Sequence, residues 1–343
     1  MPMHLRFGKA KLKTPTELVA KIISAISHLS EPKERTKEKA LEDVGRYLEQ
    51  MKVHLFGDEE HSLQKDTVLN VATAAANGGL FLSICMHLGA LEFESRKDAA
   101  QVFGALLRIK DENDSAPMAN YIKEHPAILE MLFNGYQHTE DPHMGLNCGS
   151  MLRDCIRHEE LARLVLDSPM FLRFFEEIEE RKFEIAADAF ATFKDLIIRH
   201  KELVAEFLEA KFDDFFFHYK KLLKSENFFT RRQLLKLLGE LLMEPANVRV
   251  MVKYVADVHN LILMMNLLRD QYESIQYEAF HVFKVFVANP SKPPAVKDIL
   301  KNNKDKLLKY LENFHTDRAE DDEQFQDEKN FIVKEISLID ADP

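Results

Sequence analysis

Tryptophan is absent from this sequence, and cysteine, glycine and proline are scarce. The three cysteines, Cys85, Cys148 and Cys155, are too few and too unevenly spaced for a disulfide framework or a zinc site. We expect buried free thiols and a reducing compartment. With 11 glycines and 12 prolines in 343 residues, and few segments in which apolar and polar residues alternate, the composition favours helices over strands.

Long apolar runs and a surplus of positive charge are also missing. No stretch approaches 18 consecutive apolar residues, so the sequence predicts no membrane-spanning helix. Residues 1–13 are basic but lack the apolar core of a secretory signal, and we expect a flexible N-terminus and a cytoplasmic protein. The net charge of −11 argues against a nucleic-acid binder, because such proteins usually carry a basic surplus.

The common catalytic motifs are not found. The sequence contains no glycine-rich phosphate loop, no Gly-x-Ser-x-Gly elbow and no His-Glu-x-x-His pair. The histidines and acidic residues of segment 138–143 lie in a proline-containing loop without the spacing of a metal site. Asp111–Asp114 lacks the glycine and the distant glutamate of an EF-hand loop. We therefore expect no enzyme activity, no cofactor and no metal.

A pattern of residues recurs about every ninety positions. It begins with an acidic residue, and apolar residues follow at helical spacing. The three copies are Asp98-Ala99-Ala100 with Phe103, Leu106 and Leu107, then Asp188-Ala189-Phe190 with Phe193, Leu196 and Ile197, then Glu278-Ala279-Phe280 with Phe283, Phe286 and Val287. Gln233-Leu234-Leu235 with Leu238 repeats the spacing midway between the last two copies, so the unit is 45 residues long.

A repeat of this length is typical of armadillo and HEAT-type helical units. We predict an all-α, armadillo/HEAT-like helical repeat solenoid of about six to seven repeats, forming a single domain over residues 14–340. Such a unit cannot bury its apolar face alone, so neighbouring units stack and leave an extended, concave face for a partner. The sequence therefore predicts a binding surface instead of a catalytic pocket.

Two segments offer candidate contacts. In Phe228–Arg232, two phenylalanines and two arginines open a repeat helix, and Arg232, Lys236 and Glu240 then form a polar ridge at i, i+4 and i+8. A solvated helix face explains this ridge, and a cationic groove for an acidic or aromatic partner is the alternative. In Leu261–Leu268, which is mostly core by pattern, adjacent methionines also suit a wall against a docked aromatic side chain.

Two further patterns favour structural roles. His158 and His200 each follow an Ile-Arg pair at the expected end of a helix, where a histidine complements the negative end of the helix dipole. Segment Asp213–Tyr219 is rich in aromatic residues, and for Phe215 and Phe217 a core position is favoured over an exposed contact.

Several segments resemble the calcium-binding protein 39 (mouse-protein-twenty-five, Mo25-like) scaffold family. The resemblance covers about residues 5–338 and is densest from residue 145 onward. The segments that carry it are Asn147-Cys148-Gly149 with Met151-Leu152-Arg153 and Cys155–His158, Phe183–Leu196, Leu237–Leu242, Leu263–Asp270 and Tyr277–Pro290.

The resemblance implies a curved array of helices without enzymatic activity. Members of the family bind a sterile-twenty-family kinase or a related pseudokinase through the concave face and hold it in an active-like conformation. With the pseudokinase they help to activate a liver-type kinase complex. A separate pocket near the C-terminal end takes a Trp-Glu-Phe-type tail of the pseudokinase.

The resemblance also implies particular contact residues. The concave contacts fall on Phe183, Phe228 and Arg232, with Lys236 one turn further along the same helix, and the tail pocket falls on Met265 and Lys301. Three features depart from the family pattern. Phe228 stands where a tyrosine is usual, Pro245 and Val248 replace a basic and an aromatic residue, and the lysine near position 301 is shifted by one.

A peptide or cargo adaptor of the armadillo transport type is the alternative from another class. Such adaptors usually expose asparagine and tryptophan ladders along the groove, and this chain has no tryptophan.

Overall fold

The computed structural model describes residues 12–58, 62–137, 141–179, 182–317 and 322–340. Over these ranges the regular secondary structure consists of helices, with no strand. Most of the N-terminus predicted to be flexible, residues 1–11, lies outside the described residues. Contacts between Cα atoms divide the chain into two compact units, residues 1–196 and 197–343, with the boundary in the last turn of one helix. The single domain over 14–340 stays a prediction.

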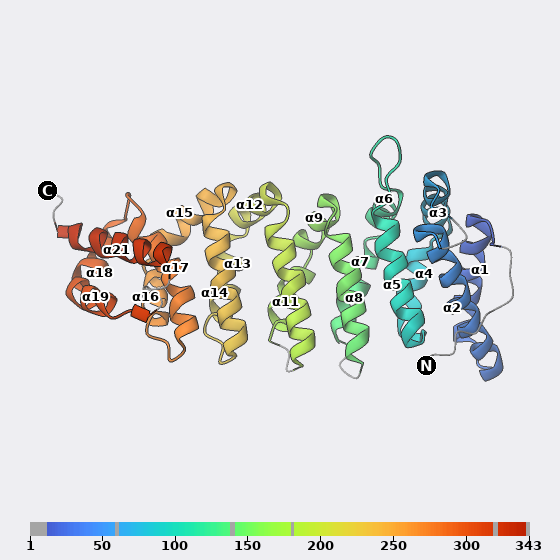
Figure 1. Ribbon diagram of the computed structural model, residues 1–343, viewed down its shortest axis with the longest axis horizontal. Helices are drawn as coiled ribbons and strands as arrows, with labels where there is room; N and C mark the ends of the chain where they lie inside the picture. The colour runs from blue at the N-terminus through green and yellow to red at the C-terminus, as the bar shows by residue number, and fades with distance from the viewer. Residues whose placement is uncertain (1–11, 59–61, 138–140, 180–181, 318–321, 341–343) are drawn as a thin grey trace. The chain divides into compact units, whose positions relative to one another are not determined.

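The helices of each unit follow one another with short connections (Figure 1). The helices of unit 1 are α1 (Pro15–Ser27), α2 (Glu34–Phe56), α3 (Lys65–Gly78), α4 (Leu80–His87), α5 (Phe93–Leu107), α6 (Pro117–Glu124), α7 (Ala127–Asn134), α8 (Pro142–Cys155), α9 (Glu159–Asp167), α10 (Met170–Glu177) and α11 (Phe183–Ile198), whose last two residues fall in unit 2. Those of unit 2 are α12 (Lys201–Ala210), α13 (Phe212–Leu222), α14 (Phe228–Met243), α15 (Val248–Ala256), α16 (Val258–Leu267), α17 (Glu273–Ala288), α18 (Pro294–Asn302), α19 (Lys304–Glu312) and α21 (Glu323–Ser337).

Local sequence sets several helix ends. The Thr14 side chain accepts a hydrogen bond from the Glu17 backbone N–H, and the Glu17 carboxylate accepts one from the Thr14 N–H, so α1 begins with a capping box. Gly79 ends α3 with φ +71°, a left-handed conformation that side chains with a Cβ rarely adopt. The chain turns there into α4.

The repeated apolar residues form the core. In unit 1, α2 packs on α5 and α5 on α8, and in unit 2, α14 packs on α17 and α17 on α21. Ala99, Phe103, Ala279 and Phe283 occupy matching positions of α5 and α17 and are completely buried. The all-α, armadillo-like repeat architecture predicted from the 45-residue period is therefore confirmed within the units.

The acidic residue that begins each copy of the pattern binds a cation from an earlier helix. Asp98 pairs with Lys52 of α2 at 2.6 Å, and Asp188 pairs with Arg153 of α8 at 2.7 Å. Glu278 lies 3.9 Å from the Nε of Arg232 of α14. The acidic position of the pattern therefore ties neighbouring long helices together, which the sequence pattern alone does not reveal.

Asp188 stands at the centre of a polar network in unit 1. It accepts hydrogen bonds from both terminal nitrogens of Arg153, at 2.7 and 2.8 Å, and from the Tyr136 hydroxyl at 2.9 Å. Thr192 joins the same group, because its hydroxyl lies 2.8 Å from that of Tyr136. A buried network with matched donors and acceptors stabilises the packing around it.

His158 and the cysteines have structural surroundings. The Nε2 atom of His158 lies 3.0 Å from the Leu107 carbonyl oxygen, so the ring complements the C-terminal end of α5, while His158 itself is the residue before α9. Cys148 and Cys155 are buried free thiols, as predicted, and Cys85 is a free thiol that is only partly buried. Burial raises the pKa of the Cys148 thiol to about 12, against a smaller lowering effect of the Arg96 charge, and it also raises the pKa of the other two thiols.

In the ranges that the structure describes, no single helix is long and apolar enough to cross a membrane, although α3 and the segment Leu80–Ala90 meet the length and composition criterion as a bent pair.

Candidate functional site

A groove between α14 and α17 in unit 2 contains two of the predicted contact residues. Asn227 caps α14 by accepting hydrogen bonds from the Phe229 and Thr230 backbone N–H groups, which sets the start of the helix. From that start, Arg232, Lys236 and Glu240 follow one another along one face. All three line a cavity of about 480 Å³, opposite residues of α17. The polar ridge predicted from the sequence is therefore the wall of a groove.

The cations of this groove differ in how firmly they are held. Lys284 of α17 binds Glu328 of α21 at 2.6 Å, and His281 lies 3.5 Å from the same carboxylate. Burial raises the pKa of Glu328, but the hydrogen bond and charge of Lys284 outweigh it and hold that pKa below its usual range. Lys236, in contrast, is exposed and forms no ion pair within the residues that the structure describes.

The two arginines at the start of α14 have different environments. Arg231 binds Asp270 at 2.6 Å, with side chains only 14% and 10% exposed, and so anchors α14 to the segment after α16. Arg232 has a side chain that is 48% exposed and a loose contact with Glu278. Of the two arginines, Arg232 therefore has the more exposed side chain, and its role as a partner contact stays a prediction.

The side chains of the two predicted aromatic contact residues, Phe183 and Phe228, are exposed. Phe228 is 37% exposed at the first turn of α14, and its ring centroid lies 4.7 Å from that of Tyr272. Phe183 is 60% exposed at the first residue of α11, in unit 1.

In the aromatic-rich helix α13, Phe215 is buried as favoured, whereas Phe217 is 68% exposed. A core position for Phe217 was therefore the wrong choice between the two alternatives.

A second cavity in unit 2, of about 470 Å³, contains Met265. Apolar residues of α16, α18 and α19 line it, including Ile262, Ile299 and Leu307. The lysine that lines it is Lys306, while Lys301 is exposed on α18 and is not part of the lining. Two residues along a helix correspond to a rotation of about 200°, so Lys301 faces away from the side on which Ile299 reaches the cavity.

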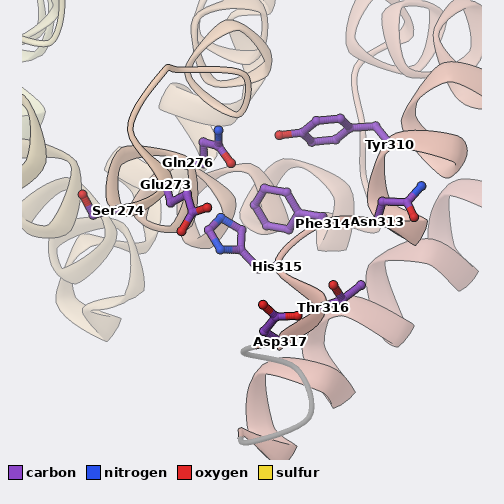
Figure 2. A pocket seen from close by; sticks show the side chains of 9 residues that line it. All are labelled: Glu273, Ser274, Gln276, Tyr310, Asn313, Phe314, His315, Thr316 and Asp317. Atoms are coloured by element: carbon purple, nitrogen blue, oxygen red, sulfur yellow. The ribbon is translucent and has the colours of Figure 1, made fainter.

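A third cavity lies beside both of these, with a volume of about 720 Å³. Figure 2 shows its walls, which are Glu273, Ser274 and Gln276 at the start of α17 and the segment Tyr310–Asp317. Ser274 also lines the α14–α17 groove, and Tyr310 also lines the Met265 cavity. The Tyr310 hydroxyl donates a hydrogen bond to the Leu268 carbonyl, and burial raises its pKa. No motif in the sequence pointed to this cavity, because its two walls are about forty residues apart.

Metal-binding clusters of three or more histidine, cysteine or acidic residues do not occur in the described ranges. Asp141, from the segment considered for a metal, caps α8 and binds Arg96 at 2.5 Å. Residues 138–140 of that segment lie outside the described residues. In the other segment considered, the Asp111 carboxylate accepts hydrogen bonds from the Asn113 and Ser115 backbone N–H groups and so closes a local turn.

Comparison with known proteins identifies the family. The family model described as Mo25-like matches residues 5–340. The degreening-related gene dee76 protein of Auxenochlorella protothecoides is 52% identical over 310 residues, which cover 90% of this chain and 95% of that protein. The calcium-binding protein 39-like protein of Homo sapiens is 46% identical, covering 94% of each chain, and the Mo25-like protein of Schizosaccharomyces pombe is 45% identical, covering 88% of this chain and 91% of that one. The chain therefore belongs to the Mo25-like family.

Proposed function

We propose that this protein is a non-catalytic scaffold that binds and allosterically activates a sterile-twenty-family kinase or a related pseudokinase. The contact surface is the α14–α17 groove with Phe228, as part of the predicted concave face. The Met265 cavity takes a Trp-Glu-Phe-type tail of the pseudokinase. Family membership supports this function. The α14–α17 groove is the observation that links the function to particular residues of this chain.

The accessible ridge of α14 supports a role in binding. Arg232 and Lys236 stand one turn apart on the wall of a groove, and Phe228 is one turn before them. An arginine and an aromatic ring next to one another are typical of the few residues that contribute most to a protein interface. Because Arg231 already provides the buried anchor to Asp270, Arg232 can change partners without loss of the fold.

The Met265 cavity supports a second attachment. Its apolar lining and half-buried methionine suit an aromatic side chain, and Lys306 and Arg269 provide positive charge for a neighbouring carboxylate. A partner that occupies both the groove and this cavity gains affinity, because its second contact is intramolecular.

Activation follows from differential affinity for two kinase conformations. A scaffold that binds the closed conformation more tightly than the open one shifts the population toward the closed state. Moving a kinase from 1:99 to 99:1 requires a preference of about 5.5 kcal/mol. A few well-buried contacts can supply this difference, since a single hot-spot residue contributes about 2 kcal/mol or more.

The test measures activation of a purified sterile-twenty-family kinase by the wild-type chain and by Arg232→Ala. We expect Arg232→Ala to lower activation at least about tenfold, as for loss of a hot-spot side chain. Arg249→Ala is the matched control, because it removes an exposed arginine of unit 2 that does not line the groove. Full activation by a folded Arg232→Ala chain would exclude this residue as a contact.

A second measurement addresses the tail cavity. A labelled peptide ending in Trp-Glu-Phe should bind the wild-type chain and lose binding to Met265→Glu. A folded chain that neither binds the peptide nor stimulates a kinase would favour the alternative of a peptide or cargo adaptor.

A further inference from the structure

A basic groove between α1 and α2 is not explained by the proposed function. The two helices pack side by side at the start of unit 1 (Figure 1). Between them lies a cavity of about 540 Å³ whose lining includes Lys21, Lys33, Arg35 and Lys39. All of its residues belong to unit 1, whereas Arg232, Lys236 and Met265 belong to unit 2.

The positive charge of this groove is not neutralised by the protein. Lys21, Lys33, Arg35 and Lys39 are exposed, and none of the four forms an ion pair within the described ranges. One carboxylate, Asp43, lines the groove, and it is already paired with Arg46. Four uncompensated cations in a chain of net charge −11 form a local field of the opposite sign, which attracts an anionic partner.

Three glutamates of α2 lie along another line of the helix. Glu34, Glu38 and Glu42 follow one another at i, i+4 and i+8 and do not belong to the lining of the groove. The lining residues Arg35, Lys39 and Asp43 form the adjacent line. The groove line therefore carries two cations and one carboxylate, Asp43, which is paired with Arg46.

The groove also contains neutral hydrogen-bonding groups. Ser24 and His28 line it from α1, and Thr36 and Tyr47 line it from α2. The Tyr47 hydroxyl lies 3.3 Å from an Arg46 nitrogen, and the Lys13 ammonium lies 5.5 Å from the centre of the Tyr47 ring. Lys13, which is among the described residues, therefore adds a further positive charge near Tyr47.

The dimensions fit an extended peptide. Arg35 and Lys39 are one turn apart, a rise of about 6 Å along the helix. In an extended chain, alternate side chains on one face are about 6.6 Å apart. From Arg35 to Tyr47 the groove follows α2 for about 18 Å, which corresponds to five or six extended residues. A flat membrane surface does not match a groove whose apolar lining consists of two small residues, Ala25 and Ala40.

We propose that the α1–α2 groove is a docking site for an acidic peptide segment of a partner protein, bound in extended form with carboxylates at alternate positions. Arg35 and Lys39 pair with successive carboxylates, while Lys21 and Lys33 hold the peptide from the α1 side and from the connection before α2. This site is independent of the kinase-binding proposal.

The experiment measures fluorescence anisotropy of a labelled peptide, Gly-Glu-Ser-Glu-Ser-Glu-Gly, titrated with the full chain. We expect saturable binding that weakens with added salt and is lost when glutamine replaces each glutamate. Arg35→Glu/Lys39→Glu should weaken binding at least tenfold. Lys65→Glu is the control, because it reverses an exposed charge outside the groove and should change affinity less than twofold.

Three results would overturn the proposal. The first is that the folded wild-type chain shows no saturable binding of the peptide. The second is that the double variant and the control lose peptide affinity equally, and the third is that the double variant keeps the wild-type affinity. Circular dichroism verifies folding, and Lys21→Gln/Lys33→Gln provides a milder variant should the charge reversal disturb α2. Binding of phosphatidylserine vesicles through the same cations, without peptide binding, would replace the peptide by a membrane surface and also refute the proposal.

Discussion

Gly149 in α8 allows a sharp test of how the polar network of unit 1 is built. A Cβ atom at this position would lie 1.9 Å from the Oδ2 atom of Asp188 and 2.3 Å from the Tyr136 hydroxyl. Neither group is free to move away, because Arg153 holds the Asp188 carboxylate with two hydrogen bonds. Gly149→Ala must therefore break or displace these contacts.

The magnitude follows from two opposing effects. Replacing glycine by alanine inside a helix contributes about 1 kcal/mol of stability through propensity. Overpacking costs about 1–3 kcal/mol, and disruption of a buried ion pair costs about 3–5 kcal/mol when one partner is lost altogether. Asp188 and Arg153 stay present and are 14% and 25% exposed, so their ion pair is weakened and not removed. We expect Gly149→Ala to lower the free energy of unfolding by about 2–4 kcal/mol.

Gly239 is the matched control. It also lies inside a long helix, α14, but a Cβ atom there would have its nearest neighbour, Val282 Cγ2, at 4.0 Å, which is ordinary contact. Gly239→Ala should therefore stabilise the protein by up to about 1 kcal/mol. Urea unfolding followed by circular dichroism at 222 nm measures both variants.

The two glycines should thus respond with opposite signs. A Gly149→Ala chain as stable as the wild type would refute the argument that the network is rigid. A further variant separates the clash from other effects, since in an Asp188→Ala background the cost of Gly149→Ala should shrink.

Three other expectations concern ion pairs and thiols. Arg231→Met should destabilise unit 2 by about 3–5 kcal/mol in urea unfolding because it leaves Asp270 buried without its cation, and a loss below about 1 kcal/mol would contradict that role. The lowered pKa of Glu328 means that its contact with Lys284 stabilises the fold above the unfolded-state pKa of about 4.5 and is lost as the pH falls through the folded-state value. Glu328→Gln should therefore flatten the acid side of a stability–pH profile, and an unchanged profile would count against this linkage. Cys148 should react with a thiol reagent at pH 8 only on unfolding, because its raised pKa keeps the native thiol protonated, and rapid labelling of the native chain would disprove this.

Much of the fold could be predicted because armadillo-like packing is local. Each repeat contacts its neighbours in the sequence, so the apolar residues that recur at a fixed period can be predicted as core residues even when distant contacts are unknown. The buried residues Phe103 and Phe283 are examples in which pattern and structure agree. Phe217 shows the limit, because adjacent aromatic residues on α13 cannot all face the core and the sequence does not say which one is outside.

The candidate site was only partly predictable. Arg231 and Arg232 are adjacent and chemically identical, so the sequence does not say which of them is exposed. In the structure Arg231 binds the Asp270 carboxylate, and Arg232 remains exposed. Lys301 and Lys306 belong to the two helices, α18 and α19, that contribute residues to the Met265 cavity. The direction in which each side chain leaves its helix decides that Lys306 lines the cavity and Lys301 does not. The cavity of Figure 2 is formed by segments about forty residues apart and left no local signal.

By itself, the sequence determined the helices, their 45-residue repeat and the core residues of the repeated pattern, since each of these depends on local or periodic chemistry. Membership in the Mo25-like family follows from sequence similarity. The tertiary structure alone decided which charges are held in close ion pairs and which remain accessible. A charge's environment depends on the neighbouring repeat, as the pairs Lys52–Asp98 and Arg153–Asp188 and the looser contact of Arg232 with Glu278 demonstrate. That dependence is why the same acidic position of the repeat forms close ion pairs in α5 and α11 and borders the α14–α17 cavity in α17.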